Sequence, residues 1–180
     1  HAYSRPVRFL FLSNLFDAKG IRDVVDAVKM LNVKKDLGFH LDVAGSWLDE
    51  SVKAYCLGQA KEHGLPVTFF PPVSGEEKLE RFSEADVFIF TPREPEGHPW
   101  VIVEAMAAAL PVLATDQGAI KESVMDGDNG FIVKTHDPAD LAGKMEFLAR
   151  DRERAKSMGR RSYELYNLKF TEEKMVENYV

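Results

Sequence analysis

Short apolar runs alternate along the chain with longer amphipathic segments. In each run the valine, isoleucine, leucine and phenylalanine residues are consecutive and do not alternate with polar ones, as expected of strands that are buried on both faces. The runs predict strands at Val7–Leu12, Phe39–Ala44, Val67–Phe70, Val87–Phe90, Val112–Ala114 and Phe131–Val133.

The segments between these runs carry helical signals. Apolar residues recur at helical spacing from Ile21 to Leu31, and a second helix is predicted over Trp47–His63. Ser74 and Glu77 form a candidate capping box for a third helix. Further helices are predicted over Trp100–Ala109, from the Asp137-Pro138 cap towards Arg150, over the polar segment Asp151–Lys169, and from a cap at Thr171 with Glu172 and Glu173 in its first turn.

The alternation of strand and helix indicates the fold class. Consecutive strands joined by helices run parallel, and the helices cover both faces of the sheet. We therefore predict a single α/β domain over residues 1–180, with a Rossmann-like, doubly wound parallel sheet of about six strands. Ligands of such sheets bind beyond the carboxyl ends of the strands, where the strand order reverses. With the common order 3-2-1-4-5-6, the loops at residues 13–20 and 91–99 meet at that point.

The composition is that of a globular domain with its own core, because 45% of the 180 residues are hydrophobic and 29% are charged. The net charge of −6 argues against a nucleic-acid surface, so an anionic ligand must be held by local features. No apolar run approaches the ~20 residues of a membrane span. A single cysteine, Cys56, excludes an internal disulfide framework and favours a reducing compartment.

The two ends of the sequence also carry information. No basic segment leads into an apolar stretch at the start, so no signal peptide is expected. The sequence starts at His1, without an initiator methionine, and stops at Val180 inside a predicted helix. We therefore expect it to be a piece of a longer protein.

The second of the two loops runs into an alanine-rich helix in the stretch EPEGHPWVIVEAMAAALPV. Pro99 suits the first position of that helix, where its missing N–H costs nothing. The amides of Trp100 and Val101 would then form an anion site together with the helix dipole. Gly97 would let the backbone come close to a ligand.

Carboxylates beside an anion site suit sugar hydroxyls, because each oxygen accepts hydrogen bonds. Glu96 lies in the loop, Glu104 lies one to two turns into the helix, and Lys19 of the first loop adds positive charge across the cleft. A diphosphate flanked by two sugar-binding acids describes a nucleotide sugar. The G-x-G-x-x-G and P-loop patterns of other nucleotide sites do not occur in the sequence.

The same residues carry a family resemblance. Glu96 and Glu104 form a Glu-x7-Glu motif inside EGHPWVIVEAMAAALPVLATDQGAIKESVMDGDNGFIV, and Lys19-Gly20, Ala44-Gly45 and Val73-Ser74 extend the match. Over nearly its whole length the chain resembles the C-terminal, donor-binding domain of retaining, family-4 type glycosyltransferases of the GT-B fold (glycosyl transferases group 1). The resemblance implies one half of a GT-B fold, whose N-terminal domain is absent from this sequence.

The resemblance implies a role for each matched residue. Lys19 would bind the donor diphosphate, Glu96 would be the catalytic residue near the reacting carbon of the sugar, and Glu104 would bind the ribose hydroxyls. Val73 would offer backbone contacts to the base. The remaining donor-binding residues would be Asn14 in the first loop and the backbone of Gly97, His98, Pro99, Trp100 and Val101. No metal and no cofactor is implied.

The chain departs from the family pattern at three places. Ser13-Asn14 stands where the family often has Gly-Arg, so one phosphate cation is missing. Arg93 could supply that charge, but we expect Arg93 to lie in solvent. Ala109 stands where glycine commonly ends the helix, and a left-handed turn kept there would cost ~1 kcal/mol. Pro71 also replaces a common glycine.

Simpler interpretations exist for individual residues. Glu104 could be a solvated helix acid and Lys19 an exposed lysine, and their joint spacing with Glu96 is what favours a donor site. His98 could act as an acid or base, although the resemblance assigns it mainly a backbone role. Cys56 is expected to pack on a helix face.

We therefore expect a metal-independent, retaining, hexosyltransferase-like enzyme domain. It would bind a nucleoside-diphosphate sugar for transfer to an acceptor glycan, lipid or small molecule, in polysaccharide or glycoconjugate biosynthesis. An N-terminal domain would supply much of the acceptor site, so this chain alone should be inactive. We expect a cytoplasmic location, compatible with peripheral association at the inner face of the membrane, and no nucleic-acid partner. The alternatives are a non-catalytic nucleotide-sugar-binding module and another GT-B enzyme, such as a nucleotide-sugar epimerase.

Overall fold

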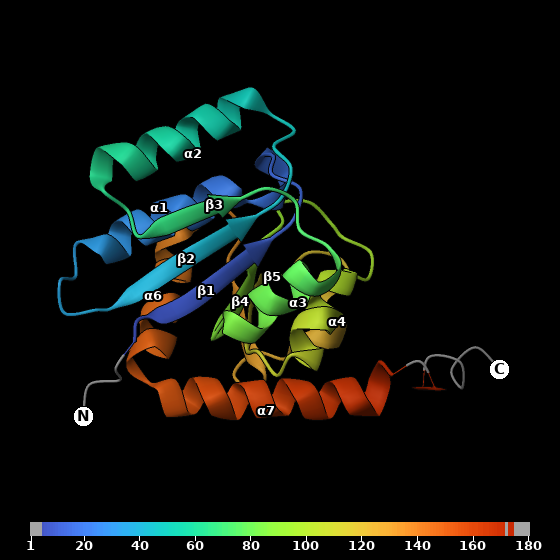
Figure 1. The fold of residues 1–180 in the computed structure, drawn as a ribbon. Coiled ribbons are helices and arrows are strands. Elements are labelled where there is room, and N and C mark those ends of the chain that lie inside the picture. The colour runs from blue at the N-terminus through green and yellow to red at the C-terminus, as the bar shows by residue number, and fades with distance from the viewer. Residues whose placement is uncertain (1–4, 172, 175–180) are drawn as a thin grey trace.

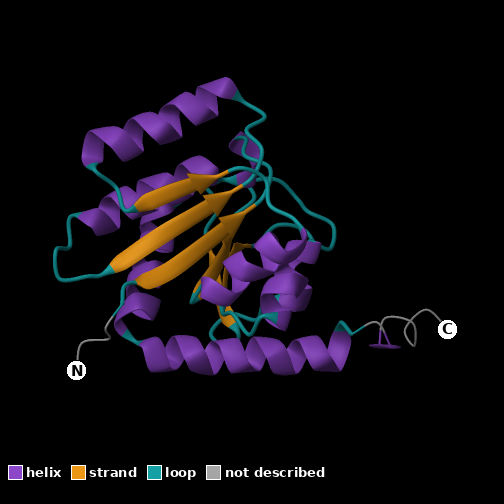
Figure 2. Cartoon of the chain, in the orientation of Figure 1, coloured by secondary structure: helices purple, strands orange, loops and turns teal. Residues whose placement is uncertain are grey.

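The computed structural model describes residues 5–171 and 173–174 of the chain. A six-stranded parallel sheet lies at its centre, with helices on both faces (Figures 1 and 2). Each predicted strand forms, and the last two are one residue longer than predicted. The strands are β1 (Val7–Leu12), β2 (Phe39–Ala44), β3 (Val67–Phe70), β4 (Val87–Phe90), β5 (Val112–Thr115) and β6 (Gly130–Val133).

The strand order is β3-β2-β1-β4-β5-β6, which confirms the predicted doubly wound α/β class. The central strand β1 pairs with β2 from Val7 opposite Phe39 to Leu12 opposite Ala44, and with β4 on its other side. The order therefore reverses between β1 and β4. The loops that leave the carboxyl ends of these two strands are the ones that frame the predicted site.

The helices follow the predicted order, with two short additions that were not predicted, a 3-10 helix and a single turn. They are the 3-10 helix η1 (Asp17–Lys19), α1 (Ile21–Asn32), α2 (Glu50–His63), α3 (Gly75–Glu84), α4 (Trp100–Ala107), α5 (Ile120–Ser123), α6 (Pro138–Arg150) and α7 (Arg152–Lys169). The single turn α5 was not predicted. The final helix predicted from Thr171 lies largely outside the described residues, although the amide of Lys174 donates to Thr171 Oγ1 at 3.4 Å.

Two predicted helix starts are wrong. The second helix begins at Glu50 and not at Trp47, because Asp49 caps it by accepting from the amides of Ser51 and Val52. Trp47 instead forms a parallel bridge with Leu15. The capping box at Ser74 does not form, since the Ser74 side chain makes no capping hydrogen bond. The left-handed backbone of Gly75, with φ of 54°, breaks the regular first turn that such a box requires.

The predicted start of α6 is confirmed, whereas α4 ends before its predicted end at Ala109. Asp137 caps α6 by accepting from the amide of Asp140, with Pro138 as the first helical residue. The helix α4 ends at Ala107, and Ala109 adopts the left-handed conformation with φ of 56°. A residue with a Cβ therefore occupies a position at which glycine would be less strained.

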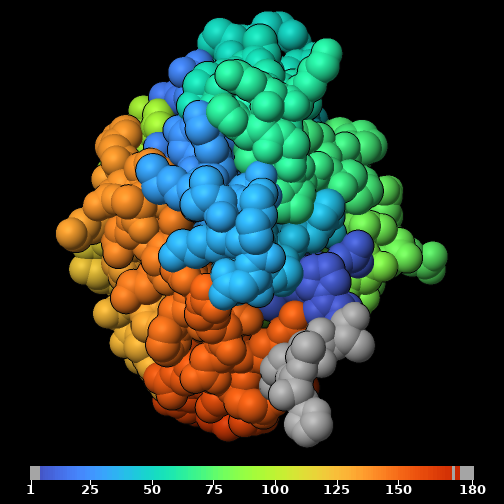
Figure 3. Space-filling view, turned by 90° about the vertical axis from the view of Figure 1, so that its left-hand side faces the viewer, coloured from blue at the N-terminus to red at the C-terminus, as the bar shows by residue number. Residues whose placement is uncertain are grey.

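The core consists of two clusters, one on each face of the sheet. Alternate residues of a strand point to opposite faces, so Phe9 packs in the cluster under α1, α2 and α6, while Leu10 packs in the cluster under α3 and α4. On the first face, α1 and α6 lie side by side, as the space-filling view shows (Figure 3). Arg150 at the end of α6 contacts Asp36 beyond the end of α1 at 2.8 Å.

The helix α7 runs along one side of the molecule and contributes to both clusters (Figure 1). Ala155 and Met158 of its first half belong to the first cluster, and Leu165 of its second half belongs to the other. Across the described residues, none of the helices is both long enough and apolar enough to span a membrane.

Candidate active site

The loops after β1 and β4 meet at the carboxyl edge of the sheet, as predicted (Figure 1). The amide of Arg93, in the loop after β4, donates to the carbonyl of Ala18, in the loop after β1, at 2.8 Å. The backbones approach still more closely at Gly20, where an added Cβ would lie 1.9 Å from the Thr91 carbonyl oxygen. The two loops therefore lie against each other at this edge of the sheet.

Lys19 and Glu96 lie together at this edge. Lys19 Nζ donates to Glu96 Oε1, and the two side chains are 20% and 23% exposed. The Lys19 ammonium also lies 5.9 Å from the ring centroids of Phe16 and of Phe90. The structure thus brings the predicted diphosphate cation and the predicted sugar-contacting acid into direct contact.

The loop that carries Glu96 is braced by the loop between β5 and α5. The amide of Ala119 donates to the Glu96 carbonyl at 3.2 Å. Gly118, with φ of 65°, lies so close that an added Cβ would be 1.9 Å from the same oxygen. Gly97 differs, because an added Cβ there would meet no atom within 4 Å. The fold therefore requires glycine at Gly118 and leaves open space at Gly97.

The helix α4 begins at Trp100, the first residue of its predicted range, although Pro99 was expected at the first helical position. Pro99 is the N-cap and not the first helical residue, and its carbonyl accepts from the amide of Ile102 at 3.0 Å. The first amides of any helix have no intrahelical partner, so those of Trp100 and Val101 face the loop. The Trp100 side chain is 63% exposed beside them. The helix start thus presents donors and an aromatic surface at the carboxyl edge.

Glu104 lies farther along α4 and contacts a different lysine. Lys78 Nζ, on α3, donates to Glu104 Oε1 at 2.6 Å. The other oxygen, Glu104 Oε2, is covered from solvent and has no hydrogen-bond partner within the described part of the chain. Sequence reasoning did not identify Lys78, because nothing in its local pattern distinguishes it from a surface lysine.

Arg93 does not lie in solvent, so that prediction is wrong. Its guanidinium is 15% exposed and makes two hydrogen bonds to Asp23 on α1, at 2.7 and 3.0 Å, and one to Asp17 on η1 at 2.5 Å. The hydrogen bonds with Asp23 raise the pKa of Arg93 against the opposing effect of burial. Arg93 is therefore a clamp between the loops, and its charge is already neutralised by these two acids.

The His98 side chain contacts three other side chains. Its ring lies 3.3 Å from Ser123 Oγ through Nε2, 4.0 Å from Glu122 Oε2 through Nδ1, and 5.1 Å from the ring centroid of Phe170. These partners come from α5 and from the segment after α7. His98 thus connects the donor loop to two other elements.

Two other predicted site residues, Asn14 and Val73, lie in the segments that follow β1 and β3. Asn14 is exposed in the loop after β1, next to Leu15, whose amide donates to the Ser46 carbonyl at 2.7 Å. Val73 is half-buried in the connection between β3 and α3. Cys56 is fully buried on α2, as predicted, and burial raises the pKa of its thiol to about 12.

Two acids in an Asp-x-Asp sequence belong to a turn and not to this edge. Asp126 accepts from the amide of Ile132 at 2.9 Å, and Asp128 contacts Arg161 at 3.0 Å. Over the residues that the structure describes, no group of three or more histidine, cysteine, aspartate or glutamate side chains is arranged to hold a metal ion.

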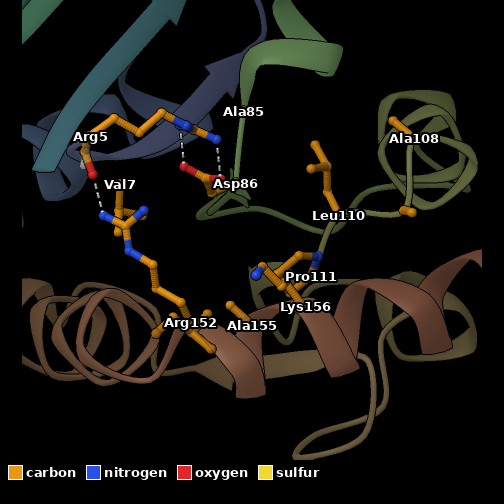
Figure 4. Close-up of a pocket in the computed structure, with 12 residues that line it drawn as sticks. Arg5, Val7, Ala85, Asp86, Ala108, Leu110, Pro111, Arg152, Ala155 and Lys156 are labelled. Atoms are coloured by element: carbon orange, nitrogen blue, oxygen red, sulfur yellow. Dashed lines mark hydrogen bonds and ion pairs between the residues drawn. The ribbon is translucent and has the colours of Figure 1, made fainter. Parts of the chain in front are cut away.

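Two pockets flank the domain. One, of about 350 Å³, lies between α3 and α4 and includes Lys78 and Glu104. The other, of about 380 Å³, lies near the amino ends of β1 and β4, against the start of α7 (Figure 4). There Arg5 binds both oxygens of Asp86, at 2.7 and 2.8 Å, and Arg152 donates to the Arg5 carbonyl. This second pocket lies at the other end of the strands from Lys19 and Glu96.

Known proteins are similar to this chain in sequence and in fold. A D-inositol 3-phosphate glycosyltransferase of Paenarthrobacter aurescens is 32% identical over 162 residues, which cover 87% of this chain and 39% of that protein. Anabaena HepE in complex with UDP and glucose matches the structure with a TM-score of 0.85 at 21% identity, over 98% of this chain and 48% of that one. The chain thus spans less than half the length of either protein.

A solved structure of similar size matches as well. It is the C-terminal domain of a glycosyl transferase group 1 family protein, LpcC, of Francisella tularensis, with a TM-score of 0.82 at 20% identity over 93% of this chain and 89% of that one. At these identities the likeness shows the fold. The family model for glycosyl transferases group 1 matches residues 2–165. Because that match covers most of the sequence and the fold agrees with it, this chain belongs to the glycosyl transferases group 1 family.

Proposed function

We propose that this chain binds a nucleoside-diphosphate sugar at the carboxyl edge of its sheet and serves glycosyl transfer, with retention, to an acceptor hydroxyl. The observation that carries the proposal is the contact between Lys19 and Glu96 beside the start of α4. Family membership supports the transferase activity. The complex of HepE with UDP and glucose supports a donor of this class.

Lys19 and the start of α4 would hold the diphosphate. A helix start offers unpaired amides and the positive end of the helix dipole, which together attract phosphate. Lys19 adds a full positive charge at the same edge. In this proposal the protein alone neutralises the diphosphate, so neither a metal nor a cofactor takes part.

The polarity of the Lys19–Glu96 pair suits the bond that breaks. As the sugar leaves the diphosphate, positive charge develops on the reacting carbon and negative charge on the leaving phosphate. A carboxylate on the sugar side and an ammonium on the phosphate side stabilise both changes, since charges fixed in advance stabilise a transition state most effectively. Glu96 would therefore act on the sugar and Lys19 on the leaving group.

Glu104 and Val73 would bind the nucleoside. Glu104 offers a carboxylate to the ribose hydroxyls, and the backbone beside Val73 would contact the base. The acceptor site would come largely from an N-terminal domain, so this chain alone would bind the donor and transfer no sugar. We further propose a cytoplasmic location, with peripheral contact to the inner face of the membrane when the acceptor is a lipid.

Calorimetric titration of the chain with UDP, GDP and ADP tests the donor site. At least one of the three should bind, and Lys19→Ala should weaken that binding ~10-fold or more, because a hydrogen bond to a charged group contributes about 1.5–3 kcal/mol. Lys53→Ala, which removes an exposed lysine on α2, is the matched control and should change nothing. If none of the three nucleotides binds, the proposal is wrong.

A non-catalytic binding module remains the second candidate, and Glu96 discriminates the two. In a two-domain protein that carries this chain, Glu96→Gln should lower sugar transfer strongly if Glu96 acts in the transition state. If the wild-type two-domain protein binds the nucleotide sugar but transfers nothing to any acceptor, the module is the better description.

A further inference from the structure

The ion pair between Lys78 and Glu104 joins α3 to α4, and both residues line the groove between these helices. The two side chains are 26% and 41% exposed. The groove is otherwise lined mainly by apolar side chains, those of Leu79, Phe82, Ala107 and Ala108. Apolar walls reduce screening by water, so this pair interacts more strongly than a pair on an open surface.

The two oxygens of Glu104 have different surroundings. Oε1 accepts from Lys78 at 2.6 Å, whereas Oε2 is covered from solvent and unpartnered among the residues described. A covered acceptor without a donor is unfavourable. The Glu104 side chain as a whole is 41% exposed, so a ligand can approach it and displace the atoms that cover Oε2. A ligand whose hydroxyl then donates to Oε2 relieves the cost, and a ligand without that hydroxyl does not.

Lys78 also links the proposed ribose contact, Glu104, to the segment that carries the proposed base contact, Val73. The helix α3 buries only one side chain among its described residues, that of Phe82, whereas α4 buries Ile102, Val103, Ala105 and Met106. The helix α3 is therefore the less firmly anchored of the two. It follows directly on the connection that holds Val73, so the Lys78–Glu104 pair ties that connection to α4.

We infer that Lys78 is a positioning residue for ribose recognition. It anchors the Glu104 carboxylate through Oε1 and leaves Oε2 without a partner among the described residues, so that a ribose hydroxyl can satisfy Oε2 once it displaces the atoms that cover it. This inference rests on the proposed function, in which Glu104 binds the ribose. According to this inference, the site needs Lys78 to distinguish a ribonucleotide from its 2′-deoxy counterpart.

Calorimetry tests the inference by comparing the affinities of the chain for UDP and for 2′-deoxy-UDP. ADP and GDP are titrated in parallel, each with its own 2′-deoxy form. The wild-type chain should prefer the ribonucleotide ~10-fold, because a site built for a hydroxyl rejects the ligand that lacks it. Lys78→Met should reduce this preference to ~2-fold, mainly by lowering the affinity for the ribonucleotide, because the acceptor is no longer anchored. Lys78→Arg should keep most of the preference, because it restores a cation on α3.

The control is Lys53→Met, which removes an exposed lysine of α2 and should leave the preference unchanged. Thermal unfolding of each variant shows that the fold is retained. If Lys78→Met is folded and keeps the full preference for the ribonucleotide, the inference is wrong and the pair only joins two helices. If Lys78 had a purely structural role, Lys78→Met would lower the affinities for the ribonucleotide and the deoxynucleotide equally.

Glu104→Gln separates this inference from the proposed function. If Glu104→Gln abolishes the preference and Lys78→Met does not, the ribose role of Glu104 stands and the role of Lys78 is rejected. If Glu104→Gln leaves the preference intact, or if the wild-type chain shows none, the ribose role of Glu104 fails and the role of Lys78 fails with it.

Discussion

The ammonium group of Lys19 contacts the carboxylate of Glu96 although the two residues are 77 positions apart in the sequence. The contact exists because the loops after β1 and β4 leave the sheet side by side, where the amide of Arg93 donates to the carbonyl of Ala18. Each charge lowers the cost of holding the other at a half-buried edge. A diphosphate that binds Lys19 must therefore compete with Glu96 for the ammonium group.

This competition leads to a prediction for Glu96→Gln. Removing the carboxylate frees Lys19, so the affinity for a nucleoside diphosphate should stay the same or rise by ~3-fold, while Lys19→Ala weakens it. Calorimetry on the chain measures both variants. Raising the salt concentration should weaken the wild-type affinity, since the charges are partly exposed. Loss of nucleotide affinity in Glu96→Gln as large as in Lys19→Ala would mean that Glu96 itself binds the diphosphate.

Arg93→Gln should destabilise the domain and weaken nucleotide binding together. Breaking a fully buried ion pair costs about 3–5 kcal/mol, and the loss should be smaller here because Asp17 is half exposed. Urea unfolding gives the change in stability. Arg150→Gln is the control, because it removes an exposed arginine with two acidic partners away from the site, and it should be much milder. Equal effects of the two variants would contradict the clamp.

Gly118→Ala and Gly127→Ala form a matched pair. Both glycines have positive φ, at 65° and 76°, so each alanine adds backbone strain of about 1–2 kcal/mol. Only Gly118 has a neighbour in the way, since an added Cβ at Gly127 meets nothing within 4 Å. Gly118→Ala should therefore cost clearly more stability and should displace Glu96, weakening the ion pair with Lys19. Equal free energies of unfolding for the two variants would show that the Glu96 loop moves aside from the added methyl group at little cost.

The Cys56 thiol should resist modification in the folded chain. Burial raises its pKa to about 12 from the usual 9.0, so the reactive thiolate is scarce at neutral pH. The unfolded chain loses this proton first as the pH rises, so the contribution of Cys56 to stability is present below pH 9 and declines between 9 and 12. A colorimetric thiol reagent at pH 8 should react quickly only in urea. Fast reaction without urea would show that α2 opens readily.

The strands and their order could be predicted because buried parallel strands have a distinctive pattern and few permitted connections. Runs such as Val87–Phe90 are apolar throughout, and each lies where that pattern predicts. The one-turn helix α5 escaped prediction because four residues are too short to show a helical period. The start of α2 was misplaced because the cap at Asp49, and not the apolar Trp47, determines it.

The site residues could be named from sequence, but their partners could not. Glu96, Glu104 and Lys19 stand in recognisable motifs, and the structure places Glu96 against Lys19. The partners of Arg93, Asp17 and Asp23, lie 76 and 70 positions away, so only the folded chain brings them together. Lys78 and Glu104 are likewise on different helices, 26 positions apart. From sequence alone, each of these charged residues is therefore expected to be solvated, and only the structure shows that it forms an ion pair.

The position of α7 determines where the chain can be shortened. Because Ala155 and Met158 cover one face of the sheet and Leu165 covers the other, a fragment that ends at Asp151 would lose cover on both faces at once. Such a fragment would expose apolar surface on two sides and would tend to aggregate. The smallest fragment of this domain that can be expressed in folded form must therefore include all of α7. A protease cut within that helix would destabilise the rest of the domain as well as the helix.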